Sequence, residues 1–470
     1  MTFVFYYLVA LIVLGVTHLV YKWRNPKCNG VLPPGSMGLP FIGETLQYFS
    51  PQPLEGIPPF ISQRIARYGP LFRTSILGQR VVVSSDPVVN QHIFQQEGEA
   101  FQCWYTESSI KILGKNNLNG QHGNAHKYLR NLFLDLIGPE NLKGELIHEM
   151  DGNTRDHLSS WACKDEVDVK EELEIMVFKL AAKKLLDFDE KQVLEMRDNY
   201  KFLKKAFISL PLGIPGTALH AALQGRKKAK KMIKCAFDAR RLSKEINLDF
   251  IGHLLKEIED EGTILTEEIA ADLVYVLLFA AFETTSTTIT LCLKFIHEHP
   301  KVLEQLKEEH QQILNDRVDK DCPVTWKEYK SMNYTHMVIN ETVRLADNAP
   351  GIFRKVMEDV NIKGYTVPAG WTLVVCPSVT HYNPDEYDNP YLFNPSRWQG
   401  QELHLGSRKF MAFGGGRRLC AGADFAKLQM AIFIHYLVTK YRWKITKEGS
   451  ISRTPGLTFN KPICVQITKA

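Results

Sequence analysis

A cysteine near the C-terminal end of the chain, Cys420, stands where a sulfur could do chemistry. It follows an aromatic residue, three glycines and two arginines in the run Phe413-Gly414-Gly415-Gly416-Arg417-Arg418-Leu419. Glycines can take positive φ and so let the backbone approach something large and flat. Beyond Cys420, apolar residues recur at three- and four-residue spacing, which predicts a helix. A thiol at a helix N-terminus beside arginines is expected to have a lowered pKa and to supply a thiolate.

The thiol of Cys420 has four open uses: a nucleophile, a zinc ligand, a haem ligand or a small buried side chain. Zinc knuckles need closely spaced cysteines, whereas the neighbouring cysteines along the chain are Cys376 and Cys464. The glycines also lack the Gly-x-x-x-x-Gly-Lys-Ser/Thr spacing of a phosphate loop. A bulky planar cofactor ligated by one sulfur therefore stands among the remaining interpretations.

A second stretch with chemical potential lies inside a long helical pattern. Thr266 is placed as an N-cap, Glu267 and Glu268 suit the first turn, and the pattern runs to about His297. The segment is apolar nearly all round, which predicts a buried helix of roughly 45 Å.

Residues 280–288 of that helix are Ala-Ala-Phe-Glu-Thr-Thr-Ser-Thr-Thr. This composition is poor for a helix, because β-branched residues lose rotamer freedom and hydroxyls can bond back to the carbonyl four residues earlier. One interpretation is a bent helix whose hydroxyls satisfy its own backbone. The other is that the small Ala280 and Ala281 leave room for a cofactor while Glu283 and Thr284 handle protons.

The cysteine loop resembles the signature of the cytochrome P450 family, the haem-thiolate monooxygenases. Residues 413–422 match Phe-x-x-Gly-x-Arg-x-Cys-x-Gly position by position. The resemblance implies haem b as the cofactor, with Cys420 as the thiolate ligand of the iron and Phe413 beside the haem.

The long helix is similar to the oxygen-activation motif of the same family, with Ala281 in place of the usual glycine. The resemblance implies that Thr284 and Glu283 are catalytic, Thr284 toward dioxygen and Glu283 as a proton relay. It also implies that Ala280 lies against the haem.

Four more residues are implied as ligands of the haem propionates. His126 and Arg130 are four apart and share one helical face, where the family places a Trp or His and an Arg. Arg418 belongs to the cysteine motif, and Arg354 matches a further propionate ligand of the family.

Three charged residues are implied as scaffold rather than catalytic groups. Glu341 and Arg344 are three apart on one predicted helix, and alone would form a surface ion pair of little value. The family joins such a pair to a later arginine, here Arg397, in a network behind the haem. Bidentate pairing of arginine with a carboxylate makes this network physically reasonable.

The N-terminal stretch from Phe3 to Tyr21 is almost entirely apolar and close to the ~20 residues of a membrane-spanning helix. Lys22, Arg24 and Lys27 follow, which predicts that this side is cytoplasmic and the N-terminus lumenal. A cleaved signal peptide is the alternative, but the charges come after the apolar stretch rather than before it.

The resemblance implies one large catalytic domain behind an anchor, although a length of 470 residues alone would suggest two or three domains. The expected fold is mainly α with a small β-rich lobe, namely the cytochrome P450 fold preceded by an N-terminal transmembrane helix. Its predicted parts are an anchor at 1–21, a basic and Pro/Gly-rich hinge at 22–43 and a haem-thiolate domain at 44–470, with a hairpin near 78–83 and strands at 365–367 and 371–375. The densely basic segment 226–241 is interpreted as a solvated helix face, with a membrane or partner contact as the alternative.

Composition agrees with a large folded enzyme. Hydrophobic residues make up 44% of the 470, and the formal charge of +5 is too mild to imply a nucleic-acid partner. Nine cysteines without paired short spacings argue against a disulfide framework and for a reducing compartment.

The resemblance extends to plant enzymes that oxidise sterols, brassinosteroids and triterpenoids. It implies a lipophilic substrate, dioxygen, and electrons from NADPH through a separate flavoprotein reductase, since the chain has no flavin or nicotinamide fingerprint. It also implies a single-pass protein of the endoplasmic reticulum membrane whose catalytic domain is cytoplasmic. The pocket is expected at Trp104, Phe353, Leu457 and Phe459, and the reductase-docking face at Arg408, Lys409, Arg417 and Lys427.

Two rival functions are carried alongside this one. A haem-thiolate isomerase or lyase would rearrange an oxygenated lipid without dioxygen and would not depend on NADPH. A membrane haem carrier or scaffold would show no turnover even with a reductase present.

Overall fold

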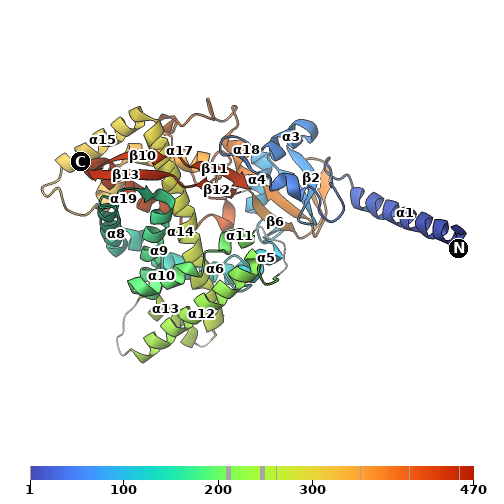
Figure 1. The fold of residues 1–470 in the computed structure, drawn as a ribbon, viewed down its shortest axis with the longest axis horizontal. Helices are drawn as coiled ribbons and strands as arrows, with labels where there is room; N and C mark the ends of the chain where they lie inside the picture. The colour runs from blue at the N-terminus through green and yellow to red at the C-terminus, as the bar shows by residue number, and fades with distance from the viewer. Residues whose placement is uncertain are drawn as a thin grey trace.

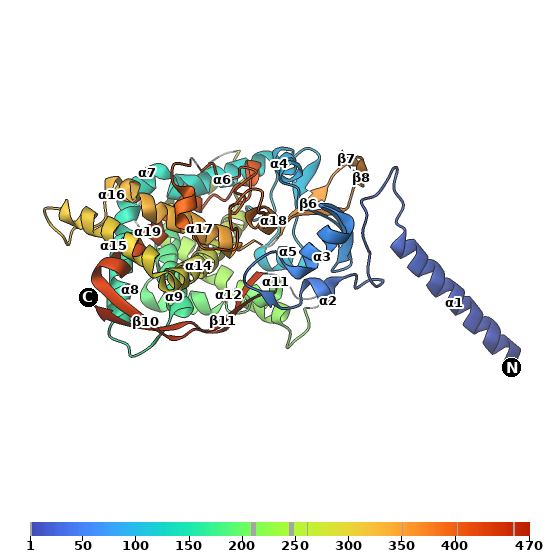
Figure 2. The ribbon, with the colours of Figure 1, turned by 90° about the horizontal axis from the view of Figure 1, so that it is seen from above.

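Helices make up most of the body of the protein, and a smaller lobe built on a β-sheet lies beside the N-terminal helix (Figures 1 and 2). The computed structural model describes residues 2–207, 213–243, 249–260, 262–349, 351–401, 403–454 and 456–470. The expectation of a mainly α fold with a small β-rich lobe is confirmed.

The helices occupy most of the chain outside the strands, with the longest in the middle of the body (Figure 1). They are α1 (Thr2–Arg24), α2 (Thr45–Tyr48), α3 (Pro59–Tyr68), α4 (Pro87–Gln95), α5 (Glu107–Leu113), α6 (Gly123–Ile137), α7 (Pro139–Asn141), α8 (Ile147–Trp161), α9 (Val169–Leu186), α10 (Glu190–Asp198), α11 (Leu203–Phe207), α12 (Ala218–Leu242), α13 (Phe250–Glu259), α14 (Glu267–Glu298), α15 (Pro300–Asn315), α16 (Trp326–Ser331), α17 (Asn333–Ala346), α18 (Pro377–His381) and α19 (Ala423–Lys440).

Strands are short and form four small sheets. They are β1 (Gln52–Pro53), β2 (Leu71–Ile76), β3 (Gln79–Ser84), β4 (Phe101–Cys103), β5 (Val167–Asp168), β6 (Ile352–Val356), β7 (Val360–Ile362), β8 (Tyr365–Val367), β9 (Thr372–Val375), β10 (Tyr441–Lys447), β11 (Ser450–Thr454), β12 (Gly456–Lys461) and β13 (Cys464–Lys469). The sheet of the lobe has the order β2-β3-β9-β6-β4, with only β3 and β9 parallel.

The predicted hairpin is present as β2 and β3. Leu77 and Gly78 connect the strands, and both have positive φ, 52° and 74°. Positive φ at both central residues is the requirement of the two-residue hairpin turn whose twist matches that of the strands. The three valines Val81, Val82 and Val83 are buried, as a run of β-branched residues predicts.

The long central helix is also confirmed, as α14. Thr266 caps it by accepting the N–H of Ile269 at 3.3 Å, and it ends at Glu298, within a residue of the expected end. Its length and apolar character would allow it to cross a membrane, but 72% of its apolar window is buried inside the body. It packs along α9, so α14 is the core helix around which the body is built.

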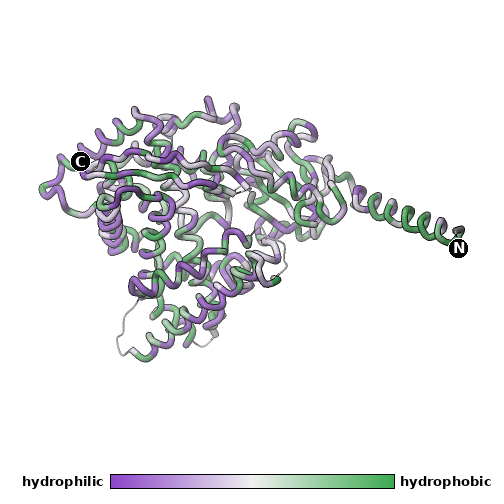
Figure 3. The backbone as a smooth tube through the Cα atoms, viewed as in Figure 1, coloured by the Kyte–Doolittle hydropathy of each residue, from purple (hydrophilic) through white to green (hydrophobic). Residues whose placement is uncertain are grey.

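Helix α1 is apolar, as α14 is, but it is exposed rather than buried. It extends from the body as an apolar rod (Figure 3), and none of its apolar window is buried. The helix continues to Arg24, so that Lys22 and Arg24 form its last turn. The segment after it is held along the lobe, where Gly35 pairs with Arg73 and Gly43 with Ile76.

The basic segment on α12 is only in part the solvated face that the sequence suggested. Arg226 and Lys230 both reach the buried carboxylate of Asp272 on α14, at 2.5 Å and 2.7 Å. Lys227 and Lys228 remain exposed. One side of the basic run therefore fastens α12 to α14, because a buried carboxylate needs compensating cations.

A buried carboxylate on α17, that of Glu341, joins three segments. It receives two hydrogen bonds from Arg344, at 2.8 Å and 2.9 Å, and one from Arg397 Nε at 2.9 Å. The backbone N–H of Asn394 and the indole N–H of Trp398 also donate to it, each at 3.0 Å. The expected network of Glu341, Arg344 and Arg397 is therefore present, with both carboxylate oxygens saturated.

The network continues toward the cysteine loop through His381. Arg344 Nη1 donates to the carbonyl of His381 at 2.6 Å, and the Nε2 of His381 accepts the N–H of Met411 at 3.2 Å. Burial, with the charges of Arg344 and Arg453, lowers the pKa of His381 to about 3. The ring is therefore neutral near pH 7, which keeps Nε2 free to accept this bond.

Replacement of Glu341 by alanine should lower the free energy of unfolding by about 3–5 kcal/mol, because Arg344 and Arg397 would be left buried without a counter-charge. The matched control is Glu140→Ala, which removes an exposed ion pair with Lys143 on the protein surface. Thermal and denaturant unfolding followed by circular dichroism would measure both. Equal stability of the two variants would contradict the assigned role of Glu341.

Candidate active site

A cavity of about 420 Å³ lies between α14 and the loop that leads into α19. Eight of the residues predicted from the sequence to form the site line it: Ala280, Thr284, Cys420, Phe413, Arg418, His126, Arg130 and Arg354. They come from α6, α14, β6 and the cysteine loop, segments up to about three hundred residues apart. The ninth predicted residue, Glu283, is not on the described lining.

The cysteine loop is shaped by its own backbone and by α4. The N–H of Cys420 donates to the carbonyl of Phe413 at 2.9 Å, which closes the loop. Gly414 and Gly416 have φ of 75° and 61°. A Cβ at Gly416 would lie 2.1 Å from the carbonyl oxygen of Phe94, and one at Gly415 would lie 2.5 Å from the Phe94 ring. Two of the three glycines thus permit close packing on α4 rather than an approach to the cavity.

The environment of the Cys420 thiol differs from the sequence expectation of a lowered pKa. Burial raises the pKa of this thiol, while the N–H of Gly422 and the charge of Arg130 oppose the rise. The expectation was wrong for the free thiol because it weighed the helix end and the arginines without the loss of water around the sulfur.

Another wall is α14, whose residues Val276, Leu277, Ala280, Ala281, Thr284, Thr285 and Thr288 line the cavity, with Ala280 and Thr284 the most exposed of them. Thr284 Oγ1 donates to the carbonyl of Ala280 at 2.8 Å. Ser286, Thr288 and Thr290 likewise donate to carbonyls four residues earlier, at 2.5, 2.8 and 2.7 Å. The hydroxyl run therefore satisfies its own backbone, as one of the two interpretations required, and also places Thr284, Thr285 and Thr288 on the cavity lining.

Glu283 points to the other side of α14. Its carboxylate is held by Lys204 at 2.5 Å and by Lys170 at 3.5 Å. Burial raises the pKa of Glu283, but the two lysines outweigh burial and leave the pKa below its usual value. Glu283 is therefore ionised and adjacent to Thr284 in the chain, but it is not on the described cavity lining.

Cationic side chains gather along one end of the cavity. Arg130 Nη1 donates to the carbonyl of Leu419 at 2.7 Å, and Arg418 donates to the carbonyl of Gln121 at 2.6 Å. Burial lowers the pKa of Arg130, and nearby Arg418 adds to the lowering. Burial and the same arginines lower the pKa of His126 to about 4, so His126 is neutral near pH 7.

Glu97 is the carboxylate that sequence reasoning missed at this cluster. It pairs with Arg354 Nε at 2.7 Å and with Arg418 Nε at 3.0 Å, and accepts the N–H of Cys103 at 3.1 Å. No motif marks Glu97, and it lies 321 residues before Arg418 in the chain. Only the fold brings it into the site.

The charges at this end of the cavity do not balance. Three guanidinium groups, those of Arg130, Arg354 and Arg418, face a single carboxylate, that of Glu97, among the described residues. Buried cations are costly unless an anion compensates them. A flat group that carries carboxylates, as haem carries propionates, fits a cavity with cations at one end and a thiol on its face.

The pocket walls differ from those expected. None of Trp104, Phe353, Leu457 and Phe459 is on the described lining. Successive side chains of a strand point to opposite faces, so on β6 Ile352 and Arg354 face the cavity while Phe353 faces away. The ring of Phe353 instead lies against the ring of Trp104, with 6.1 Å between the two ring centres. Apolar residues of α6, α9 and α14 form the wall, including Phe133, Leu180, Val276 and Leu277.

The four residues predicted to form the reductase-docking face differ in their exposure to solvent. Arg408, Lys409 and Arg417 are exposed near the cysteine loop. Lys427 is half-buried, with its ammonium 5.6 Å from the centre of the Phe413 ring, and burial lowers its pKa. Its place on the inner side of α19 removes Lys427 from the surface to which sequence reasoning assigned it.

Comparisons with known proteins agree with this geometry. A family model described as "Cytochrome P450" matches residues 33–463. "Cytochrome P450 87A3" of Oryza sativa subsp. japonica is 49% identical, over 95% of this chain and 88% of its own. "Beta-amyrin 16-alpha-hydroxylase CYP87D16" of Maesa lanceolata is 41% identical, over 98% of each chain. The solved structure "Retinoic acid bound cyanobacterial CYP120A1" superposes with a TM-score of 0.85 at 26% identity, over 94% of this chain and 100% of that one.

Replacement of Glu97 by glutamine should lower the free energy of unfolding by roughly 3 kcal/mol, because Arg354 and Arg418 would then face each other without a counter-charge. Glu99→Gln is the matched control, since Glu99 lies two residues away and makes only a 3.9 Å contact with exposed Arg417. Thermal unfolding of both variants would measure the difference. A Glu97→Gln protein as stable as the control would remove Glu97 from this cluster.

Proposed function

The chain belongs to the cytochrome P450 family and is a haem-thiolate monooxygenase of that family, and from this premise we propose its substrate class, its setting and its site residues. It hydroxylates a sterol or triterpenoid-type lipid, using dioxygen and electrons that a separate flavoprotein reductase passes on from NADPH. Helix α1 holds it in the endoplasmic reticulum membrane, with the catalytic domain in the cytoplasm.

One observation carries this proposal: the thiol of Cys420 and the hydroxyl of Thr284 line the same cavity, and its wall on α14 carries no charged side chain. Arg130, Arg354 and Arg418 line the cavity as well, so it offers cations in addition to the thiol. This arrangement suits a planar cofactor lying over the sulfur, with an apolar substrate on the side of α14.

Cys420 is the proposed iron ligand, and the loop around it is built for that role. The bond from its N–H to Phe413 fixes the position of the sulfur, and Arg130 stabilises a negative charge on it. When bound, the haem supplies the oxidation chemistry, for which a thiolate ligand favours cleavage of the O–O bond. Phe413 and Ala280 are the proposed neighbours of its two faces.

Arg130, Arg354 and Arg418 are the proposed partners of the propionates, with His126 as a neutral donor. Binding of two carboxylates would offset the excess of buried positive charge at that end of the cavity. Glu97 orients Arg354 and Arg418 by holding one nitrogen of each. Arg418 also donates to the carbonyls of Leu118 and Gln121, and Arg354 to that of Phe353, so the positions of both guanidinium groups are fixed at the cavity.

Thr284 and Glu283 are the proposed proton-handling pair, with distinct duties. Thr284 Oγ1 holds a proton at the cavity wall, and release of its bond to Ala280 lets it donate toward dioxygen. Glu283 is ionised beside Lys204, whose side chain is half exposed to solvent. For Glu283 to take up a proton and pass it inward, its carboxylate must leave Lys204.

The substrate class rests on the apolar walls and on a relative. Wall residues such as Phe133, Leu180 and Val276 offer no charged partner to a substrate, which suits a rigid hydrocarbon skeleton. The relative from Maesa lanceolata bears the name of a β-amyrin hydroxylase. Exposed Arg408, Lys409 and Arg417 are the proposed contact for an acidic reductase surface.

Expression in yeast that makes sterols and triterpenes, together with a plant reductase, should yield products heavier by one oxygen atom, with the label of isotopic dioxygen. The Cys420→Ser protein at equal abundance is the control and should give none of them. Product formation without NADPH or dioxygen would favour an isomerase or lyase, and no product with any offered lipid would favour a haem carrier.

Thr284→Ala should uncouple the reaction, because the cavity would lose its most exposed α14 hydroxyl while the fold keeps its helix. Product formed per NADPH is expected to fall by at least about tenfold, with hydrogen peroxide rising in its place. Ser286→Ala is the matched control, since that hydroxyl is on the same helix and outside the described cavity lining. Unchanged coupling in Thr284→Ala would exclude Thr284 from proton delivery.

A further inference from the structure

A second cavity, a groove of about 750 Å³, opens where α1 meets the β-rich lobe. The last turn of α1 contributes Arg24 to its lining, and α2 and α3 contribute Leu46 and Arg67. The segment after α1 contributes residues 35–39 together with Ile42 and Gly43. The groove is remote from the cysteine loop and has no part in the proposed catalysis.

The end of α1 is fixed against the lobe beside this groove. Trp23 Nε1 donates to the carbonyl of Met37 at 3.0 Å, and the Trp23 ring lies 6.2 Å from the ring of Phe41. Tryptophan and basic residues at the end of an apolar helix mark the boundary between hydrocarbon and water. With α1 in a bilayer, these contacts hold the groove at the depth of the lipid headgroups.

The groove has an excess of positive charge. Its charged lining residues are Arg24, Glu44, Arg64 and Arg67. The carboxylate of Glu44 forms a salt bridge with Arg64 at 2.8 Å and accepts a hydrogen bond from the hydroxyl of Thr74 at 2.6 Å. Arg24 and Arg67 have no ion pair within the described part of the chain, and Arg67 rests 5.2 Å from the Tyr68 ring. Guanidinium groups bind phosphate through paired N–H donors.

The rim of the groove is apolar and strained. The loop from Leu39 to Gly43 closes through a 2.7 Å bond from Gly43 N–H to the carbonyl of Leu39. At its tip Phe41 has a φ of 65°, an unfavourable conformation for a bulky side chain. This conformation leaves Phe41 78% exposed, and nearby Leu46 is 73% exposed. Such a cluster beside a membrane helix suits contact with acyl chains rather than water.

We propose that this groove binds one anionic phospholipid. Its phosphate pairs with Arg24 and Arg67, and its acyl chains lie against Leu39, Phe41 and Leu46. The bound lipid bridges α1 and the lobe, and so fixes the angle at which the catalytic domain stands on the membrane. The assignment rests on the proposed membrane anchoring by α1, and commits to a lipid because apolar side chains and unpaired arginines share the same opening.

The test uses the full-length protein, stripped of lipid in a non-ionic detergent and examined by native mass spectrometry. Phosphatidylserine and phosphatidylcholine of equal chain length are offered together. The wild-type protein should retain one phosphatidylserine in preference to phosphatidylcholine. In the Arg24→Ala/Arg67→Ala protein, the ratio of retained phosphatidylserine to retained phosphatidylcholine should fall by about tenfold or more.

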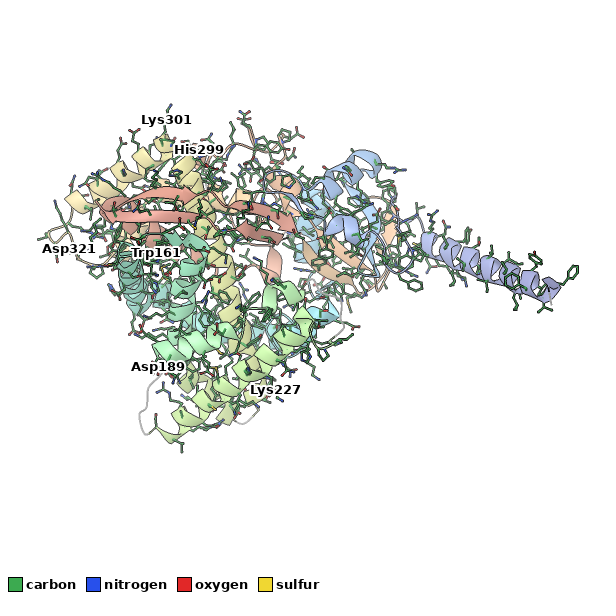
Figure 4. All side chains as sticks on the ribbon, in the orientation of Figure 1. Trp161, Asp189, Lys227, His299, Lys301 and Asp321 are labelled. Carbon is green, nitrogen blue, oxygen red and sulfur yellow. The ribbon has the colours of Figure 1, made fainter. Side chains whose placement is uncertain are left out.

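The matched control is Lys227→Ala/Lys228→Ala, which removes two exposed charges from α12, away from α1 (Figure 4). It should retain phosphatidylserine as the wild type does. Equal retention of both lipids by the wild type, or equal loss in the control, would overturn the site. Flotation with phosphatidylcholine vesicles tests the anchor separately, since failure to float would refute anchoring by α1 while the mass spectra still judge the groove.

Discussion

The buried carboxylate of Glu341 is the constraint on which the rest of the structure depends. The desolvation free energy of a buried carboxylate is offset only when both its oxygens accept hydrogen bonds. The donors here are Arg344 on α17, the N–H of Asn394 and Arg397. Arg344 then extends the network to His381, whose ring accepts from Met411. The loop that carries Cys420 begins two residues later, so hydrogen bonds connect the cysteine loop to a salt bridge in the interior of the body.

Electrostatics divide the cavity into two parts with different tasks. At one end, Arg130, Arg354 and Arg418 outnumber the one carboxylate, and this imbalance prepares the site for an acidic group. Along α14 the lining is apolar apart from its hydroxyls, so the same cavity can hold a lipid. Glu97 belongs to the first part, because its pairs with Arg354 and Arg418 reduce the repulsion between those two arginines.

Helix α14 fits both interpretations that the sequence offered for residues 280–288, namely hydroxyls bonded to their own backbone and groups that face a cofactor cavity. Its hydroxyl residues bond to their own backbone, which lets a helix poor in good helix formers stay intact inside the core. The same bonds leave Thr284 as a hydroxyl at the cavity surface. Glu283 is next in the chain but points in a direction about 100° around the helix from Thr284. It is held there by Lys170 and Lys204, so the acid and the alcohol are adjacent in the chain without sharing the cavity lining.

The chain alone determined the features that depend on local pattern. The apolar run of α1, the capped and buried α14, the valine hairpin and the spacing around Cys420 all follow from periodicity, capping and motif, and the structure has each of them. The resemblance to cytochrome P450 rested on these motifs, and the relatives and the fold agree with it. The members of the cavity were also predictable where a motif named them.

Tertiary structure decided what no local pattern encodes. Glu97 joined the arginines because β4 and β6 pair, Phe353 left the pocket because a strand alternates its faces, and burial reversed the expected shift of the Cys420 pKa. Lys427 is half-buried rather than fully exposed for the same reason, since the exposed fraction of a side chain depends on packing. Sequence thus determined which chemical groups the protein possesses, and packing determined which of them meet, because distance, burial and orientation arise only between segments far apart in the chain.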